Sequence, residues 1–317
     1  MNKEHIRLEE KSFVNIENSG SLKSSLRSYV KEWQICGYVI TNAISSGAFL
    51  VLFTGLFLNH FLEQPFMSVR PSAIYSATCI SLVFLIFTAL LLSTDIKNYK
   101  RYIYGLSHPD KGSRFVMGTY SILIFGILVT LLALVVWYKN ETLSILLIYT
   151  TAAAAILLSL STAHLVLGKS KKNESWNLLG LSLHMLVHSF MAGGAAFSIA
   201  NAFFTVGSTW VFFVDMILHT AITFNLFTHI LAGVLNNNSY QKRLVKEMIS
   251  GDFKSLYWVG NILLGNVLPF VLIFFSDIPI LQTIAGILIL MGIFITDKIW
   301  IATPKIIKVK KIEVINN

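Results

Sequence analysis

Eight long apolar segments, separated by short polar stretches, dominate the 317-residue chain. Each is long enough to cross, as a helix, a bilayer core of about 30 Å, which takes about 20 residues. The short alternating segments typical of membrane β-strands are absent. The pattern therefore predicts an all-α, polytopic membrane helix bundle with eight transmembrane helices. They run over Trp33–Phe61, Ile74–Thr94, Phe115–Tyr138, Thr142–Gly168, Trp176–Phe203, Ser208–Leu235, Leu256–Phe275 and Pro279–Ile301.

The composition supports a membrane protein, and the distribution of charge predicts how the chain is oriented in the membrane. The chain is 55% hydrophobic and only 13% charged, whereas soluble domains average about 25% charged residues. Of the lysines and arginines, 22 fall on one side of the predicted spans and two on the other. The positive-inside rule then predicts that both termini are cytoplasmic. It also explains the net charge of +9 through membrane topology and anionic lipid, without a nucleic-acid partner.

This topology gives three parts. Residues 1–32 are expected to form a cytoplasmic N-terminal tail, residues 33–302 the eight-helix transmembrane domain, and residues 303–317 a basic cytoplasmic C-terminal tail. The predicted outer loops are too short to hold a catalytic core. Any chemistry is therefore expected within the helices or on a partner chain.

Ionisable residues inside a membrane span are costly, and they indicate function by default. Counting about 1.5 Å per residue along the fifth and sixth segments places His188 and His219 at nearly the same depth. His184 lies one turn below His188. Asp215 lies one turn outward of His219, so we expect a carboxylate–imidazole hydrogen bond between them.

A second group of ionisable residues is predicted near the cytoplasmic ends of the spans. It comprises His164, His229, Asp95, Asp297 and Lys298. Because water is closer at this depth, snorkelling or capping at the interface is the simpler interpretation for these residues.

Three interpretations of the deep histidines remain open at this point. They can be satisfied core residues that fix helix packing. They can form a proton-handling or quinone-binding cluster, since quinol oxidation releases protons and needs an imidazole or carboxylate near each ring oxygen. They can also ligate haem b, through His188 with His219 or His164 with His229. No sequence motif for a metal site, a phosphate-binding loop or a catalytic centre is present.

Several other residues have expected structural roles. Pro269 is expected to kink the seventh span. Four asparagines are expected to form hydrogen bonds between helices: Asn201, Asn225, Asn261 and Asn266. Aromatic residues at the predicted span ends are expected to form interface belts: Trp137, Tyr138, Trp176, Trp210, Tyr257, Trp258 and Trp300.

The connection between the second and third spans carries a recognisable set of motifs. The stretch Asp95–Tyr102 is followed by Leu106–Pro109 and then by Ser113–Gly118. It resembles the corresponding connection in the NrfD/polysulfide-reductase membrane-subunit family, which shows Asp-Leu-Gly-Arg-Pro-x-Arg-Phe, then a Pro, then Ser-Trp with a nearby Gly.

The resemblance covers most of residues 34–304. Tyr149-Thr150 looks like the start of the family's Tyr-Thr-Gly segment, and Asp215 resembles its acid in the sixth helix. Ser175–Asn177, Gly193-Gly194 and the segment from Trp258 to Pro269 are similar to further family motifs.

The resemblance implies a quinone-reactive integral subunit of a respiratory oxidoreductase in the prokaryotic cytoplasmic membrane. Such a subunit is not catalytic on its own. It binds menaquinone or ubiquinone and exchanges electrons with a ferredoxin-like iron–sulfur subunit, which serves a molybdopterin or multihaem catalytic subunit.

Within this hypothesis, the candidates for quinone binding and proton handling are Tyr149, His184, His188, Asp215 and His219. Asp95 and Arg101 are candidates for partner docking or a structural role. The alternatives from other classes are a proton-coupled transporter, a haem b cytochrome and a purely structural anchor.

Overall fold

A computed structural model describes eight stretches of the chain. They are residues 33–60, 71–95, 114–138, 141–167, 178–203, 208–234, 239–275 and 278–316. Within these stretches the chain is helical and contains no strand. Eight of the described helices are long and apolar enough to cross a membrane, which confirms the predicted all-α fold with eight spans. The chain is an integral, multi-pass membrane protein.

The described helices match the predicted segments closely. The first helix, Trp33–His60, is followed by α2 (Pro71–Asp95), α4 (Arg114–Trp137) and α5 (Glu141–Leu167). The second half contains α6 (Leu178–Ala200), α7 (Ser208–Val234), the short helix α8 (Ser239–Ser250), the π-helix η1 (Leu256–Val267), α9 (Leu268–Phe275) and α10 (Pro279–Asn316). The segments η1 and α9 together make up the seventh span.

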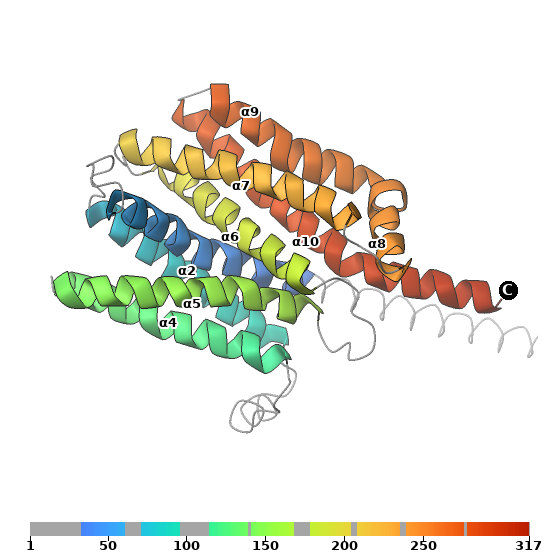
Figure 1. Ribbon diagram of the computed structural model, residues 1–317, viewed down its shortest axis with the longest axis horizontal. Coiled ribbons are helices and arrows are strands. Elements are labelled where there is room, and N and C mark those ends of the chain that lie inside the picture. The colour runs from blue at the N-terminus through green and yellow to red at the C-terminus, as the bar shows by residue number, and fades with distance from the viewer. Residues whose placement is uncertain are drawn as a thin grey trace, which may run out of the picture.

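Two helices lie at the centre of the bundle. Buried residues make up 72% of the most apolar stretch of the first helix and 61% of that of α6, against 28–39% in the other six spans. The outer spans expose large apolar side chains, as lipid contact requires. In Figure 1, α6 lies between the α4 and α5 side of the bundle and the side formed by α7, α9 and α10. The central position of α6 matters because two of the candidate histidines lie on it.

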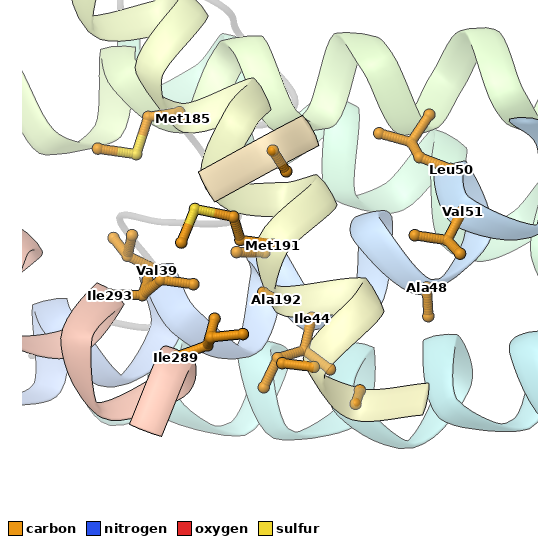
Figure 2. Close-up of a cluster of buried hydrophobic side chains, with 14 of the residues drawn as sticks. Val39, Ile44, Ala48, Leu50, Val51, Met185, Met191, Ala192, Ile289 and Ile293 are labelled. Carbon is orange, nitrogen blue, oxygen red and sulfur yellow. The ribbon is translucent and has the colours of Figure 1, made fainter. Parts of the chain in front are cut away.

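Glycine allows the two central helices to approach each other closely. A Cβ atom added at Gly47 would fall on the carbonyl oxygen of Ser189, and one added at Gly193 would fall on the backbone of Gly47. Small residues at such crossings let backbones pack against each other where the hydrophobic effect supplies no driving force between helices. Figure 2 shows the apolar cluster around this crossing, with side chains from the first helix, α6 and α10.

Small polar side chains join the first helix to its neighbours. Ser45 donates to the carbonyl oxygen of Ser81 at 2.6 Å, and Ser81 donates back to that of Ser45 at 2.8 Å, which ties the first helix to α2. Asn42 donates to the Thr162 hydroxyl of α5 at 2.6 Å. In hydrocarbon, where water is absent, hydrogen bonds of this kind fix helix positions.

The seventh span is not a regular α-helix. Its first part, η1, is π-helical, and the backbone N–H of Leu268 donates to the carbonyl oxygen of Leu263, five residues earlier. The α-helical geometry of α9 begins one residue before Pro269. Gly265 lies directly against Gly292 of α10, so the two backbones touch at this crossing. The predicted irregularity at Pro269 thus takes the form of a change in helix type.

The last helix is longer than its apolar sequence suggests. The eighth span was expected to end near Ile301, but α10 continues through Pro304 to Asn316. The expected C-terminal tail is therefore helical as far as Asn316, and Figure 1 shows it running past the end of the bundle. Asp297 and Trp300 consequently lie within a continuous helix and not at its end.

The glycine crossing gives a stability prediction. Gly47→Ala should destabilise the protein by about 3 kcal/mol, at the upper end of ordinary overpacking, because the contacting atoms are backbone and cannot move aside. The measurement is thermal unfolding of the purified chain in detergent. Gly126→Ala is the control, because its added Cβ would meet only the flexible Leu85 side chain, at 2.9 Å. Equal melting temperatures for the two variants would contradict the crossing.

Candidate functional site

Three histidines and an aspartate meet in the interior of the second half of the bundle. His184 and His188 lie one turn apart on α6, with ring centroids separated by 4.0 Å. His229 of α7 lies 5.2 Å from His184, centroid to centroid. Nδ1 of His188 lies 3.4 Å from Oδ1 of Asp297 on α10. We call these four residues the histidine cluster.

The histidine cluster is closed off from the surroundings of the protein. His184, His188 and Asp297 are each 1% exposed, and His229 is 7% exposed. Trp300 of α10 stacks on His184 with ring centroids 4.9 Å apart and an interplanar angle of 22°. Tyr257 of η1 meets His229 edge-on at 5.7 Å.

The hydrogen bonds of His184 determine which of its ring nitrogens carries the proton. Nδ1 of His184 lies 3.1 Å from the hydroxyl oxygen of Thr228. That hydroxyl donates its own proton to the carbonyl oxygen of Asn225. It can therefore only accept from His184, so Nδ1 of His184 carries a proton. In neutral His184, Nε2 is then the lone-pair nitrogen, and it has no hydrogen-bond partner among the described residues.

A chain of three hydrogen-bonded asparagines determines the protonation state of His229. Asn225 donates to Oδ1 of Asn266 at 2.8 Å. Asn266 donates to both the carbonyl oxygen and Oδ1 of Asn261, at 2.8 and 3.0 Å. The remaining donor of Asn261, Nδ2, therefore faces Nε2 of His229 at 3.1 Å. An amide N–H can only donate, so Nε2 of His229 must be an acceptor, which holds this imidazole neutral.

The π-helix explains why this chain of asparagines exists. In an α-helix, residues five apart point about 140° away from each other. In a π-helix, which bonds residue i to residue i+5, they lie on the same face. The π-helical backbone of η1 therefore stacks Asn266 on Asn261 and turns both towards α7. This confirms the expected role of Asn225, Asn261 and Asn266 as hydrogen bonds between helices.

Among the described residues, the pair His188–Asp297 is the part of the histidine cluster with the fewest hydrogen bonds. Its separation of 3.4 Å is longer than a charge-assisted hydrogen bond, which measures about 2.7–2.9 Å. Oδ2 of Asp297 and Nε2 of His188 have no hydrogen-bond partner among the described residues. An isolated charge is very costly in such surroundings. Within the described part of the chain, the pair therefore leaves unpaired polar atoms in the protein interior, next to the unpaired Nε2 of His184.

The structure does not place His188 and His219 at the same depth, although the sequence analysis expected it. The bond between His184 and Thr228, and the contact of Gly194 with Leu218, set the register of antiparallel α6 and α7. In this register His219 lies level with Gly193, roughly 7.5 Å along the axis from His188. The expectation was wrong because depth was counted separately from the two ends of the spans.

The expected bond between the side chains of Asp215 and His219 is replaced by two others. Nδ1 of His219 donates to the backbone carbonyl oxygen of Asp215 at 2.8 Å. The Asp215 carboxylate instead accepts from Nε2 of Gln282 on α10, at 2.9 Å. The ring of His219 packs edge-on against Phe270 and Phe274 of α9.

Asp215 also lines a small open hollow far along α7 from the histidine cluster. Trp210, Asn201 and Gln282 are among its other lining residues. Trp210 was expected in an interface belt, but it is 7% exposed and its indole N–H has no hydrogen-bond partner among the described residues.

The remaining candidates lie apart from the histidine cluster or outside the described part of the chain. Tyr149 is on α5, 44% exposed, and meets Phe53 of the first helix edge-on at 5.6 Å. Arg101 falls outside the described residues. Asp95 is the last residue of α2, and His164 lies within α5. Their side chains fall outside the described part of the structure.

The sequence analysis did not connect His229 and Asp297 with the other two histidines of the cluster. His229 does lie near the end of its span, as predicted, one residue before Ile230. The sequence did not show that His229 and Asp297, together with Tyr257 and Trp300, are buried within the protein. A usable signal was present beyond Pro304, where apolar residues continue at Ile306, Ile307 and Val309. A helix continuing through them would have placed Asp297 well inside the protein.

Metal and haem binding can be tested against this geometry. In the described part of the chain, no group of three His, Cys, Asp or Glu residues is placed to hold a metal ion. Axial haem ligation by His188 and His219 does not fit, since the two lie at different levels. His229 already uses Nε2 for Asn261, which leaves no free Nε2 for iron.

Comparisons with known proteins do not add to this geometry. No protein-family model matches the chain, and no curated protein matches it. The case for a function therefore depends on the residues and their arrangement.

The hydrogen-bond network predicts the tautomers of two histidines. In ¹⁵N-histidine-labelled protein, solid-state NMR should show His184 and His229 protonated at Nδ1 and unprotonated at Nε2. Single His→Gln variants assign the signals. Asn261→Leu removes the donor to Nε2 of His229 and should change the His229 signal while leaving that of His184 in place. An unchanged His229 signal in this variant would contradict the asparagine chain.

Proposed function

We propose that this chain is the quinone-reactive membrane subunit of a respiratory oxidoreductase, and that the histidine cluster handles the protons of the quinone reaction. One observation carries the proposal: His188, Asp297 and His184 come together in the interior of the helix bundle with polar atoms that no described residue satisfies. The resemblance to the NrfD/polysulfide-reductase family supports the same function.

The chemistry of the cluster suits a two-electron, two-proton reaction. Oxidation of a quinol to a quinone releases two electrons and two protons. The pair His188–Asp297 and Nε2 of His184 supply acceptors for these protons. A base within hydrogen-bond reach of a hydroxyl contributes typically 10²–10⁴-fold to proton transfer. His229 and the asparagine chain orient the site and take no proton, because Nε2 of His229 is already engaged.

The electrons need a partner in this proposal. The chain shows no motif for an iron–sulfur cluster, so we propose a ferredoxin-like iron–sulfur subunit that serves a molybdopterin or multihaem catalytic subunit. The quinone would be menaquinone or ubiquinone, and the membrane the prokaryotic cytoplasmic membrane. We propose cytoplasmic termini, in line with the positive-inside rule.

The test is quinol-dependent reduction of the co-purified partner. His188→Gln and Asp297→Asn should each lower this rate by about 100-fold, because each removes one member of the proton-accepting pair. His60→Gln is the matched control, since His60 lies exposed at the end of the first helix. Thermal unfolding of every variant is measured in parallel, because breaking a buried pair also costs stability.

The proposal fails on either of two results. One is a wild-type complex, loaded with its partner, that shows no quinol-dependent reduction. The other is a folded Asp297→Asn variant that reacts as fast as His60→Gln.

A proton-coupled transporter is the second candidate function. Transporters often build their sites at irregular spans, and the seventh span is irregular, since it changes from π-helix to α-helix at Leu268 without a break. Uptake of a substrate into proteoliposomes containing only this chain, with no partner or quinone, would support the transporter over the oxidoreductase subunit.

A further inference from the structure

Helix α8 has one face packed on the protein and one face turned away from it. It connects the end of α7 to the start of η1, so it lies at the boundary of the membrane-spanning region. Leu244 and Met248 are buried on the bundle, at 0% and 4% exposure. Burial also raises the pKa of Tyr240 at the start of this helix. Because the apolar residues of α8 pack against the bundle, the helix presents no apolar face for insertion into lipid.

The outward side of α8 is basic. Lys242, Arg243 and Lys246 are exposed, and so is Lys254, which lies just after the turn at residues 251–253. Lys242 and Lys246 lie one turn apart and so share a face. None of these three α8 cations forms an ion pair within the described part of the chain.

Two contacts hold this basic face in place. The indole N–H of Trp258 donates to the carbonyl oxygen of Ile249 at 3.1 Å, which joins the end of α8 to η1. The carboxylate of Glu247 accepts from the backbone N–H of Asp252 at 3.1 Å. The nearest acidic side chain is thus engaged in closing the turn.

A second basic segment lies close by. Helix α10 packs against α8 and runs on past the end of the bundle, as Figure 1 shows. Lysines stand at positions 305, 308, 310 and 311 of this extension.

We propose that the basic face of α8, defined by Lys242, Arg243 and Lys246, binds the phosphate headgroup of an anionic phospholipid. Its depth supports this ligand: Trp258, half-exposed at the same boundary, is the residue type enriched at headgroup level. Basic pockets at span ends bind anionic headgroups. A protein partner is less well matched, since protein interfaces rely on aromatic anchors and are depleted of charge at their centre, and the outward side of α8 has no exposed aromatic or aliphatic anchor.

The site does not depend on the proposed quinone function, and its test needs no redox partner. The purified chain is placed in nanodiscs of phosphatidylcholine with a small fraction of phosphatidylglycerol, and the lipids it retains are measured by native mass spectrometry. The wild type should retain phosphatidylglycerol selectively. The triple variant Lys242→Gln, Arg243→Gln, Lys246→Gln should lose that selectivity by about tenfold or more, since each cation near an anionic surface contributes roughly a fivefold factor.

The control removes the same charge elsewhere on the predicted same side of the membrane. It is the triple variant Lys169→Gln, Lys171→Gln, Lys172→Gln, in the connection between α5 and α6. Retained selectivity in the control, together with its loss in the α8 variant, supports the site. Equal losses in both variants, no preference of the wild type for phosphatidylglycerol, or an unchanged α8 variant would each overturn it.

Discussion

The absence of water from the hydrocarbon core is the constraint that organises this structure. Every polar group placed there must find its partner within the protein. Many serines and threonines of the outer spans donate to the carbonyl oxygen three or four residues earlier, as Ser93, Thr78 and Thr130 do. Larger polar side chains need partners on other helices, and many of them lie where α6, α7, η1 and α10 meet. The concentration of histidine, asparagine and aspartate in this one seam follows from that constraint.

The two halves of the bundle meet this constraint with different kinds of polar side chain. Around the first helix, contacts are made by small groups such as Ser45, Ser81 and Asn42, which fix positions and offer no titratable atom. In the second half, the contacts include imidazoles and a carboxylate. The contacts of the first helix thus use small polar groups, whereas those of the second half include ionisable side chains.

Hydropathy was sufficient to predict the number, order and approximate bounds of the spans, because a 20-residue apolar helix is a strong signal. It also placed His184 and His188 within a membrane span, as the structure does. It could not show that His188 faces Asp297 and not His219, because that depends on the register between helices. Register is determined by side-chain packing, such as Leu218 against Gly194, and the hydropathy pattern does not contain that information. The π-helical backbone of η1 was equally hidden, and without it Asn261 and Asn266 fall on different faces.

The π-helical geometry of η1 determines which changes in the length of this span would keep the hydrogen-bonded asparagines in place. Residues i and i+5 lie on the same face of a π-helix, just as residues i and i+4 do on an α-helix. Deleting one residue between Asn261 and Asn266 would therefore let an ordinary α-helix present the same two amides to α7. Such a deletion would leave the donor to Nε2 of His229 in place, 32 residues away in the chain, although the backbone repeat of the span had changed.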